Sequence, residues 1–132
     1  MNTRTLQHLL LLLLGTCMAA CMATQKSTGS PQVTDRDSLV RFLENEGVTL
    51  LAAQPVTASS FTQPGLAYSV ANDGGRLQVF EYRSTAEAEA DAHRVGVGMG
   101  AHVYQKGPLV ALYLGDDALV QTALLHAMGR SF

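Results

Sequence analysis

Tryptophan is absent from the chain, and only four tyrosines and four phenylalanines occur among its 132 residues. Proteins that bind single-stranded nucleic acid stack the bases on aromatic side chains, so this scarcity argues against that class of protein. The chain also lacks a run of basic residues, and its formal net charge is −2. A mildly acidic surface argues against nucleic acid as a partner and against electrostatic docking on anionic lipid.

Cysteine is almost absent as well: Cys17 and Cys21 are the two in the sequence, and both lie near its start. The rest of the chain therefore has no thiol for a disulfide or for nucleophilic catalysis. No serine lies in a G-x-S-x-G motif, the arrangement that activates serine in many hydrolases. We therefore expect a domain that is not an enzyme and is stabilised by packing alone.

The N-terminal segment has the layout of an export signal. Arg4 and the terminal amine form a short positive region, and six consecutive leucines, Leu9 to Leu14, form the apolar region. Small residues follow, as in a cleaved signal peptide. The apolar stretch from Leu9 to Ala23 is shorter than the roughly 20 residues that a permanent membrane-spanning helix needs. Residues 1–20 are therefore expected to be a signal peptide.

Two short motifs end in the cysteines, Leu14-Gly15-Thr16-Cys17 and Met18-Ala19-Ala20-Cys21. The chain here resembles bacterial lipoproteins, whose lipobox ends in the cysteine that becomes the lipid-modified N-terminus. The small residues before Cys21 and the longer apolar region favour Cys21 as the lipidation site, with Cys17 as the alternative. The resemblance implies a lipid anchor in the cell envelope.

Lipidation would hold the protein at the membrane, since each buried methylene contributes about 0.8 kcal/mol. Met22, rather than Asp, follows Cys21, and by the same resemblance this implies the outer membrane if the host is Gram-negative. Residues 21–33 then form the lipidated cysteine and a small, polar, flexible tether with a span of roughly 20 Å. A secreted soluble protein cut after Ala23 is the alternative.

Residues 34–132 have the size of one domain, and its first half is predicted from cap and turn residues. A helix is expected to begin at Thr34, with Asp37 completing a capping box, and to end at Gly47. Residues 48–53 are expected to form a strand that Pro55 ends or moves to a sheet edge. The run Asn72-Asp73-Gly74-Gly75 predicts a hairpin between strands at 66–71 and 76–82.

The second half of the domain is also predicted to contain a helix followed by a hairpin, with one more helix at its end. Ser84 to Glu87 is a capping box that opens a helix to about Val95, with Ala88 and Ala92 on its buried side. Strands at 101–106 and 109–114 are expected to form a second hairpin, and a final helix with Leu119 facing inward is expected from Asp116 through Met128. The predicted order is α-β-β-β-α-β-β-α. We expect an α+β domain with a mainly antiparallel sheet of about five strands and helices packed on one face.

Three segments of this domain are similar to a group of small uncharacterised bacterial exported or lipid-anchored proteins. They are Leu77 to Tyr82, His102 to Gly107 and Leu109 to Asp116. The resemblance covers most of the chain from about Asp37 to Phe132 and implies the location and the fold. It implies no activity.

Glu81, Tyr82, His102 and Tyr104 are the candidate pocket residues. Strand alternation places Glu81 on the face of Leu77 and Val79, where a carboxylate needs a partner such as Arg83, Tyr104 or a backbone donor. In the functional interpretation, Glu81 is a perturbed acid in a pocket with Tyr82, His102 and Tyr104. In the alternative, it is a strand-end glutamate that reaches solvent.

Other polar patterns have simpler explanations. Glu89 and His93 have helical i, i+4 spacing, but no second ligand motif accompanies them, so we expect no metal and no cofactor. Asp116-Asp117 occupies the place of a helix N-cap, and His126 the last turn of a helix, where positive charge is favourable. Glycines at 96, 98 and 100 follow a helix and do not open one after a strand, so we expect a flexible loop there and no dinucleotide site.

The sequence thus predicts a membrane-anchored envelope lipoprotein with a non-catalytic domain that binds an envelope protein or a small ligand. One alternative is a structural envelope component without a ligand. A second is a small metal-dependent or acid–base enzyme that uses Glu81, His102 and Tyr104.

Overall fold

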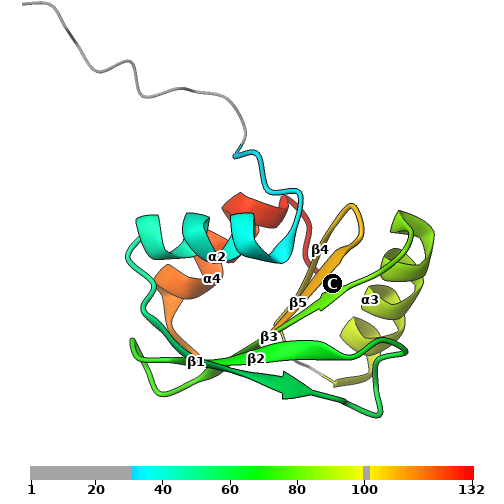
Figure 1. Ribbon diagram of the computed structural model, residues 1–132, viewed down its shortest axis with the longest axis horizontal. Coiled ribbons are helices and arrows are strands. Elements are labelled where there is room, and N and C mark those ends of the chain that lie inside the picture. Colours follow the sequence, from blue (N-terminus) through cyan, green and yellow to red (C-terminus); the bar gives the residue numbers. More distant parts are fainter. Residues whose placement is uncertain (1–30, 100–101) are drawn as a thin grey trace, which may run out of the picture.

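A five-stranded sheet lies between helices on both of its faces in the computed structural model, which describes residues 31–99 and 102–132 (Figure 1). The elements follow the predicted order and confirm the α+β class. They are α2 (Arg36–Asn45), β1 (Leu50–Val56), β2 (Gly65–Val70), β3 (Arg76–Glu81), α3 (Thr85–Met99), β4 (His102–Lys106), β5 (Leu109–Leu114) and α4 (Ala118–Met128).

The strands lie in the order β1-β2-β3-β5-β4, and every neighbouring pair is antiparallel. The turn between β2 and β3 uses Gly74 at φ 73°, and the turn between β4 and β5 uses Gly107 at φ 53°. Both are left-handed conformations that glycine adopts without steric cost. The two predicted hairpins are therefore confirmed.

The prediction that all helices pack on one face is wrong for α3. Side chains alternate along β5, so Ala111 and Tyr113 contact the cluster beneath α2 and α4, whereas Val110 and Leu112 contact the cluster beneath α3. Because β5 is apolar on both sides, each side must be covered. Ala88 and Ala92 are fully buried, which brings α3 close to the sheet, and Figure 1 shows α3 across the sheet from α2 and α4.

Two helix starts differ from the prediction by one or two residues. Asp35, not Thr34, is the N-cap of α2: its carboxylate accepts from the Ser38 N–H at 2.7 Å, and Ser38 Oγ accepts from the Asp35 N–H. Hydrogen bonding to the Asp35 carboxylate, first from the Ser38 backbone N–H and then from the Ser38 side chain, lowers the pKa of Asp35. Asp117, not Asp116, caps α4. Leu119, expected to face inward, is 47% exposed.

Strand β1 extends past the expected end at residue 53 and contains Pro55. The Ala71 N–H donates to the Thr49 carbonyl, so alternate residues of β2 counted from Ala71 face β1. The register shifts by one residue between Leu51 and Gln54, so Pro55 pairs with Leu66, which is not one of these residues, and the Pro55 nitrogen points away from β2. Proline is tolerated there because β1 is the sheet edge. None of the helices in the described ranges combines the length and the apolar character needed to cross a bilayer.

Candidate functional site

The four residues predicted to line one pocket lie in three separate places. Glu81 pairs with Leu109 on β5, whereas His102 pairs with Tyr113, four residues further along the same strand. At about 3.3 Å per residue, this separates them by roughly 13 Å along the strand. Tyr82 packs in the cluster on the α3 face. Acid–base catalysis needs groups within hydrogen-bond reach, and this arrangement does not bring Glu81 and His102 together.

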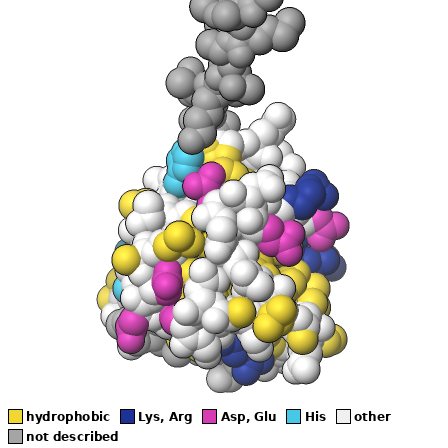
Figure 2. All heavy atoms as spheres, turned by 90° about the vertical axis from the view of Figure 1, so that its left-hand side faces the viewer, with side chains coloured by type: hydrophobic (Ala, Val, Ile, Leu, Met, Phe, Trp, Pro, Cys, Tyr) yellow, Lys and Arg dark blue, Asp and Glu magenta, His cyan; other side chains and the backbone are white. Residues whose placement is uncertain are grey.

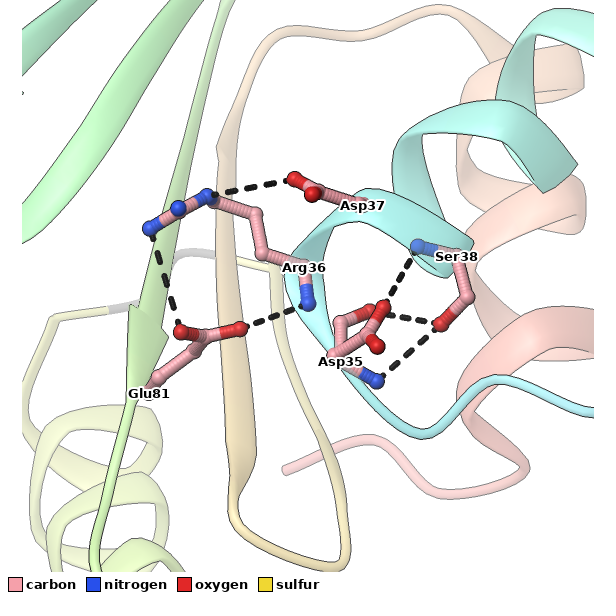
Figure 3. Close-up of polar contacts among 5 residues, drawn as sticks. All are labelled: Asp35, Arg36, Asp37, Ser38 and Glu81. Atoms are coloured by element: carbon pink, nitrogen blue, oxygen red, sulfur yellow. Dashed lines mark hydrogen bonds and ion pairs between the residues drawn. The ribbon is translucent and has the colours of Figure 1, made fainter.

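Glu81 holds the start of α2 against the sheet, as Figure 3 shows. Its Oε1 accepts from the backbone N–H of Arg36 at 2.7 Å, and its Oε2 lies 3.9 Å from Arg36 Nη1. Arg36 is the first residue of α2, and a helix N-terminus carries a partial positive charge that favours a carboxylate. The Glu81 side chain is 41% exposed, so it is the strand-end glutamate that reaches solvent, and its closest partner is a backbone donor, one of the predicted choices.

Tyr82 belongs to a polar cluster around Asp91, in which Tyr82 and Asp91 are buried and Thr62 and Arg94 are exposed. The Tyr82 hydroxyl donates to Asp91 Oδ2 at 2.7 Å, and the N–H and hydroxyl of Thr62 donate to the same oxygen at 2.9 and 2.8 Å. Arg94 Nη2 donates to the other oxygen at 2.6 Å and to the Ser60 carbonyl. The cluster therefore ties the β1–β2 loop to α3.

These contacts shift the pKa values of both Asp91 and Tyr82. Burial alone would raise the pKa of Asp91, but the hydrogen bonds from Arg94, Thr62 and Tyr82 outweigh it and hold the pKa well below its usual range. Burial, and then the bond to Asp91, raises the pKa of Tyr82. Sequence reasoning missed Asp91, although its place beside Ala92 on the small-residue side of α3 marks it as inward-facing.

A second polar cluster, also missed from sequence, surrounds Asp73 in the β2–β3 hairpin. Its Oδ1 accepts from the Gly75 N–H, and its Oδ2 accepts from the Tyr113 hydroxyl and from the N–H groups of Asp116 and Asp117. The bond from Tyr113, followed by the one from Gly75, lowers the pKa of Asp73. Asp116 therefore supplies a donor to Asp73, while Asp117 Oδ1 accepts from Val120 as the cap.

His102 and Tyr104 do share a hollow, of about 340 Å³, between β4, α4 and the end of the chain. Tyr104 is 4% exposed, and burial raises its pKa. The remaining lining offers an amide, hydroxyls and apolar side chains: Gln121, Thr122, Leu125, Ser131 and Phe132. Such a site suits hydrogen bonds and apolar contact, and none of its lining side chains is a carboxylate.

A second hollow, of about 360 Å³, lies along the other side of α4, and Thr122 lines both. Leu119 lines the second hollow and Leu125 the first, and their side chains are 47% and 48% exposed. On the side of the molecule in Figure 2, hydrophobic side chains reach the surface in several separate groups. We call the outward side of this helix the α4 surface and define it by Ala118, Leu119, Thr122, Leu125 and His126.

No group of three or more metal-ligating side chains occurs within residues 31–99 and 102–132. Glu89 forms an ion pair with Arg130 at 2.8 Å, and the His93 ring lies edge-on to Phe132. The expected loop at the glycines is wrong for Gly96 and Gly98, because α3 continues past the expected end near Val95 to Met99, and Gly100 lies outside the described residues. At Gly96, a Cβ would overlap that of Phe132. Gly96 thus serves close packing.

The predicted lipidation residues, Cys21 and Cys17, lie outside the residues that the structure describes, as do the signal peptide and most of the tether. No family model, curated protein or solved structure matches this chain.

Proposed function

We propose that the protein is a lipoprotein of the bacterial cell envelope, anchored through Cys21, whose domain binds a partner at the α4 surface without catalysing a reaction. The observation that carries the anchor is the lipobox-like Met18-Ala19-Ala20-Cys21 after the run of leucines. By the same resemblance, the location is the outer membrane if the host is Gram-negative.

The junction between tether and domain supports this arrangement. Lys106 Nζ donates to the Pro31 carbonyl at 2.9 Å and to the Ala127 carbonyl at 3.2 Å, and Val33 is 4% exposed. The chain thus enters the domain beside the C-terminal end of α4, which keeps the α4 surface within reach of other proteins at the membrane.

The engagement of the acidic side chains supports a binding role over catalysis. Glu81, Asp91 and Asp73 each accept hydrogen bonds that fix the fold, so none is poised to exchange a proton with a substrate. The α4 surface instead offers half-exposed leucines beside hydroxyl and amide groups. Such mixed surfaces are typical of protein contacts. A structural envelope component without a ligand is the second candidate, favoured by the separate apolar groups seen in Figure 2.

Replacing Cys21 with serine is expected to abolish the incorporation of labelled palmitate, because the sulfur and the new N-terminus that carry the acyl groups are lost. Cys17→Ser is the matched control and is expected to retain the label, since Cys17 lies within the signal peptide that is cleaved from the mature protein. Undiminished labelling of Cys21→Ser, measured on the immunoprecipitated protein, would refute anchorage at this cysteine.

A further inference from the structure

We propose that residues 130–132 are an autoinhibitory strap on the outer edge of β4, and that a partner binds there by replacing the strap with an extended segment of its own. Such a segment carries an aromatic side chain where the strap carries Phe132. This inference goes beyond the proposed function, because it needs neither the anchor nor the α4 surface and adds a second contact site beside that surface.

The strap covers the backbone of an edge strand. Strand β4 is the last strand of the sheet, so it pairs with β5 on one side, and the strap lies along its other side (Figure 1). The Phe132 N–H donates to the Val103 carbonyl at 2.9 Å, and the Gln105 N–H donates to the Arg130 carbonyl at 3.2 Å. This pairing is antiparallel. The strap thus occupies the backbone groups through which an edge strand binds an extended segment.

The side chains of the strap define the chemistry of a replacement. Phe132 packs against the core beneath α3, and its ring lies edge-on to His93 and 4.5 Å from the guanidinium carbon of Arg130. Gly96 provides the room for this residue, since a Cβ at Gly96 would overlap that of Phe132. We call the space beside this glycine the Gly96 notch. Ser131 lines the hollow on the α4 side. A replacing segment therefore needs an aromatic residue that fits the Gly96 notch, preceded by a small residue.

The strap is held less firmly than the strand that it covers. Phe132 is half-buried, whereas Tyr104 of β4 is 4% exposed. The ion pair between Arg130 and Glu89 of α3 is about half exposed on both sides, and exposed pairs contribute little to stability. Gly129 precedes the strap, and glycine changes its backbone angles at low steric cost. Segments with few buried contacts open while the rest of a domain stays folded, so we expect the strap to open before β4 leaves β5.

The opposite edge of the sheet is protected in a different way. The register of β1 shifts between Leu51 and Gln54, where Ala52 has φ 45°. Pro55 in the same strand has no N–H to offer. A bulge and a proline discourage pairing with another strand. Strand β4 contains no proline, and its register with β5 is regular. Opening of the strap therefore leaves β4 as the edge that accepts a strand.

Binding of a synthetic peptide tests the proposal on the full-length protein in detergent. The probe is a fluorescein-labelled peptide with the sequence of residues 127–132, and fluorescence anisotropy measures its affinity. The Phe132→Ala protein is expected to bind the probe about tenfold more tightly than wild type, because it lacks the ring that competes for the Gly96 notch. Arg130→Ala, which removes the ion pair to Glu89, is expected to shift the affinity in the same direction. Equal affinity of the three proteins, or no binding to any of them, would overturn the strap.

Two substitutions in α3 provide the matched control, each in the F132A background. Gly96→Ala fills the Gly96 notch, whereas Gly98→Ala adds a Cβ that meets nothing within 4 Å. Both replace glycine with alanine in the same helix, so both raise helix propensity. F132A/G96A is expected to bind the probe about tenfold more weakly than F132A, since the added methyl group overpacks the notch. F132A/G98A is expected to bind it as F132A does. Equal binding by the two double variants, both folded by circular dichroism, would contradict replacement of the strap at this edge.

Discussion

Replacing Asp91 with alanine is expected to lower the free energy of unfolding by about 3 kcal/mol, because the change leaves the buried Tyr82 hydroxyl without its acceptor and removes the hydrogen bonds that Arg94 and Thr62 donate to the carboxylate. The Asp91 side chain is 8% exposed and accepts from Tyr82, Thr62 and Arg94. Urea unfolding followed by far-UV circular dichroism measures the change, since the chain has no tryptophan to report it by fluorescence.

The matched control is Glu87→Ala, an exposed acid on the same helix, for which a change within about 0.5 kcal/mol is expected. A loss below about 1 kcal/mol for D91A, close to that of a typical single hydrogen bond, would mean that the cluster does not hold the loop.

The cluster around Asp91 also makes the stability of the fold depend on pH. Because hydrogen bonds lower the pKa of Asp91 in the folded state, its contribution is complete above the unfolded value of about 3.9 and is lost as the pH falls through the lower folded value. The stability difference between wild type and D91A is therefore expected to be constant near neutral pH and to shrink below about pH 4. A difference that grows with acidity would have the wrong sign.

Replacing Phe80 with alanine is expected to cost about 3–5 kcal/mol, because the ring is fully buried in the core beneath α3. It stacks on Phe61 with ring centroids 4.0 Å apart, and Gly65 leaves no room between β2 and the ring. Single domains are stable by only about 5–15 kcal/mol, so the variant is expected to be close to unfolding at 25 °C.

Phe80→Leu keeps most of the apolar volume and is expected to lose about 1.5 kcal/mol or less. Thermal and urea unfolding of the two variants would be compared. Equal stability of F80A and F80L would show that this second core contributes little, contrary to the two-layer account of the sheet.

The element order could be predicted because it depends on local signals. Asn72-Asp73-Gly74-Gly75 and Gly107 mark the hairpins, and Gly129, at φ 72°, ends α4 in the left-handed conformation. The side of the sheet on which a helix packs is not a local property. The alanine-rich α3 fits either face, and the burial of Val110 and Leu112 decided it.

The exact N-cap residue of a helix was also not predictable from the local sequence. Thr34 and Asp35 are both acceptable N-caps by type, and so are Asp116 and Asp117. Asp35 caps α2 because Ser38 completes its box, and Asp117 caps α4 because its Oδ1 accepts from the Val120 N–H. The backbone before α4 is also held by Asp73, 43 positions before Asp116, which accepts from the N–H groups of Asp116 and Asp117.

The polar clusters around Asp73 and Asp91 could not be predicted from the sequence, because the residues that form each cluster are far apart in the chain. Tyr113 lies 40 residues from Asp73, and Thr62 lies 29 residues from Asp91. The predicted pocket failed for a related reason: Glu81 and His102 lie at opposite ends of the register with β5. For Glu81 the sequence offered several partners and a solvent-exposed alternative, and the structure shows a side chain that is 41% exposed and accepts from a backbone N–H.

Intact-mass spectrometry of the mature N-terminus tests the central claim most directly. If the protein works from a lipid anchor, the mature chain begins at Cys21, lacks residues 1–20 and carries the added mass of acyl groups on that cysteine. An unacylated chain that still begins at Met1 would contradict the account.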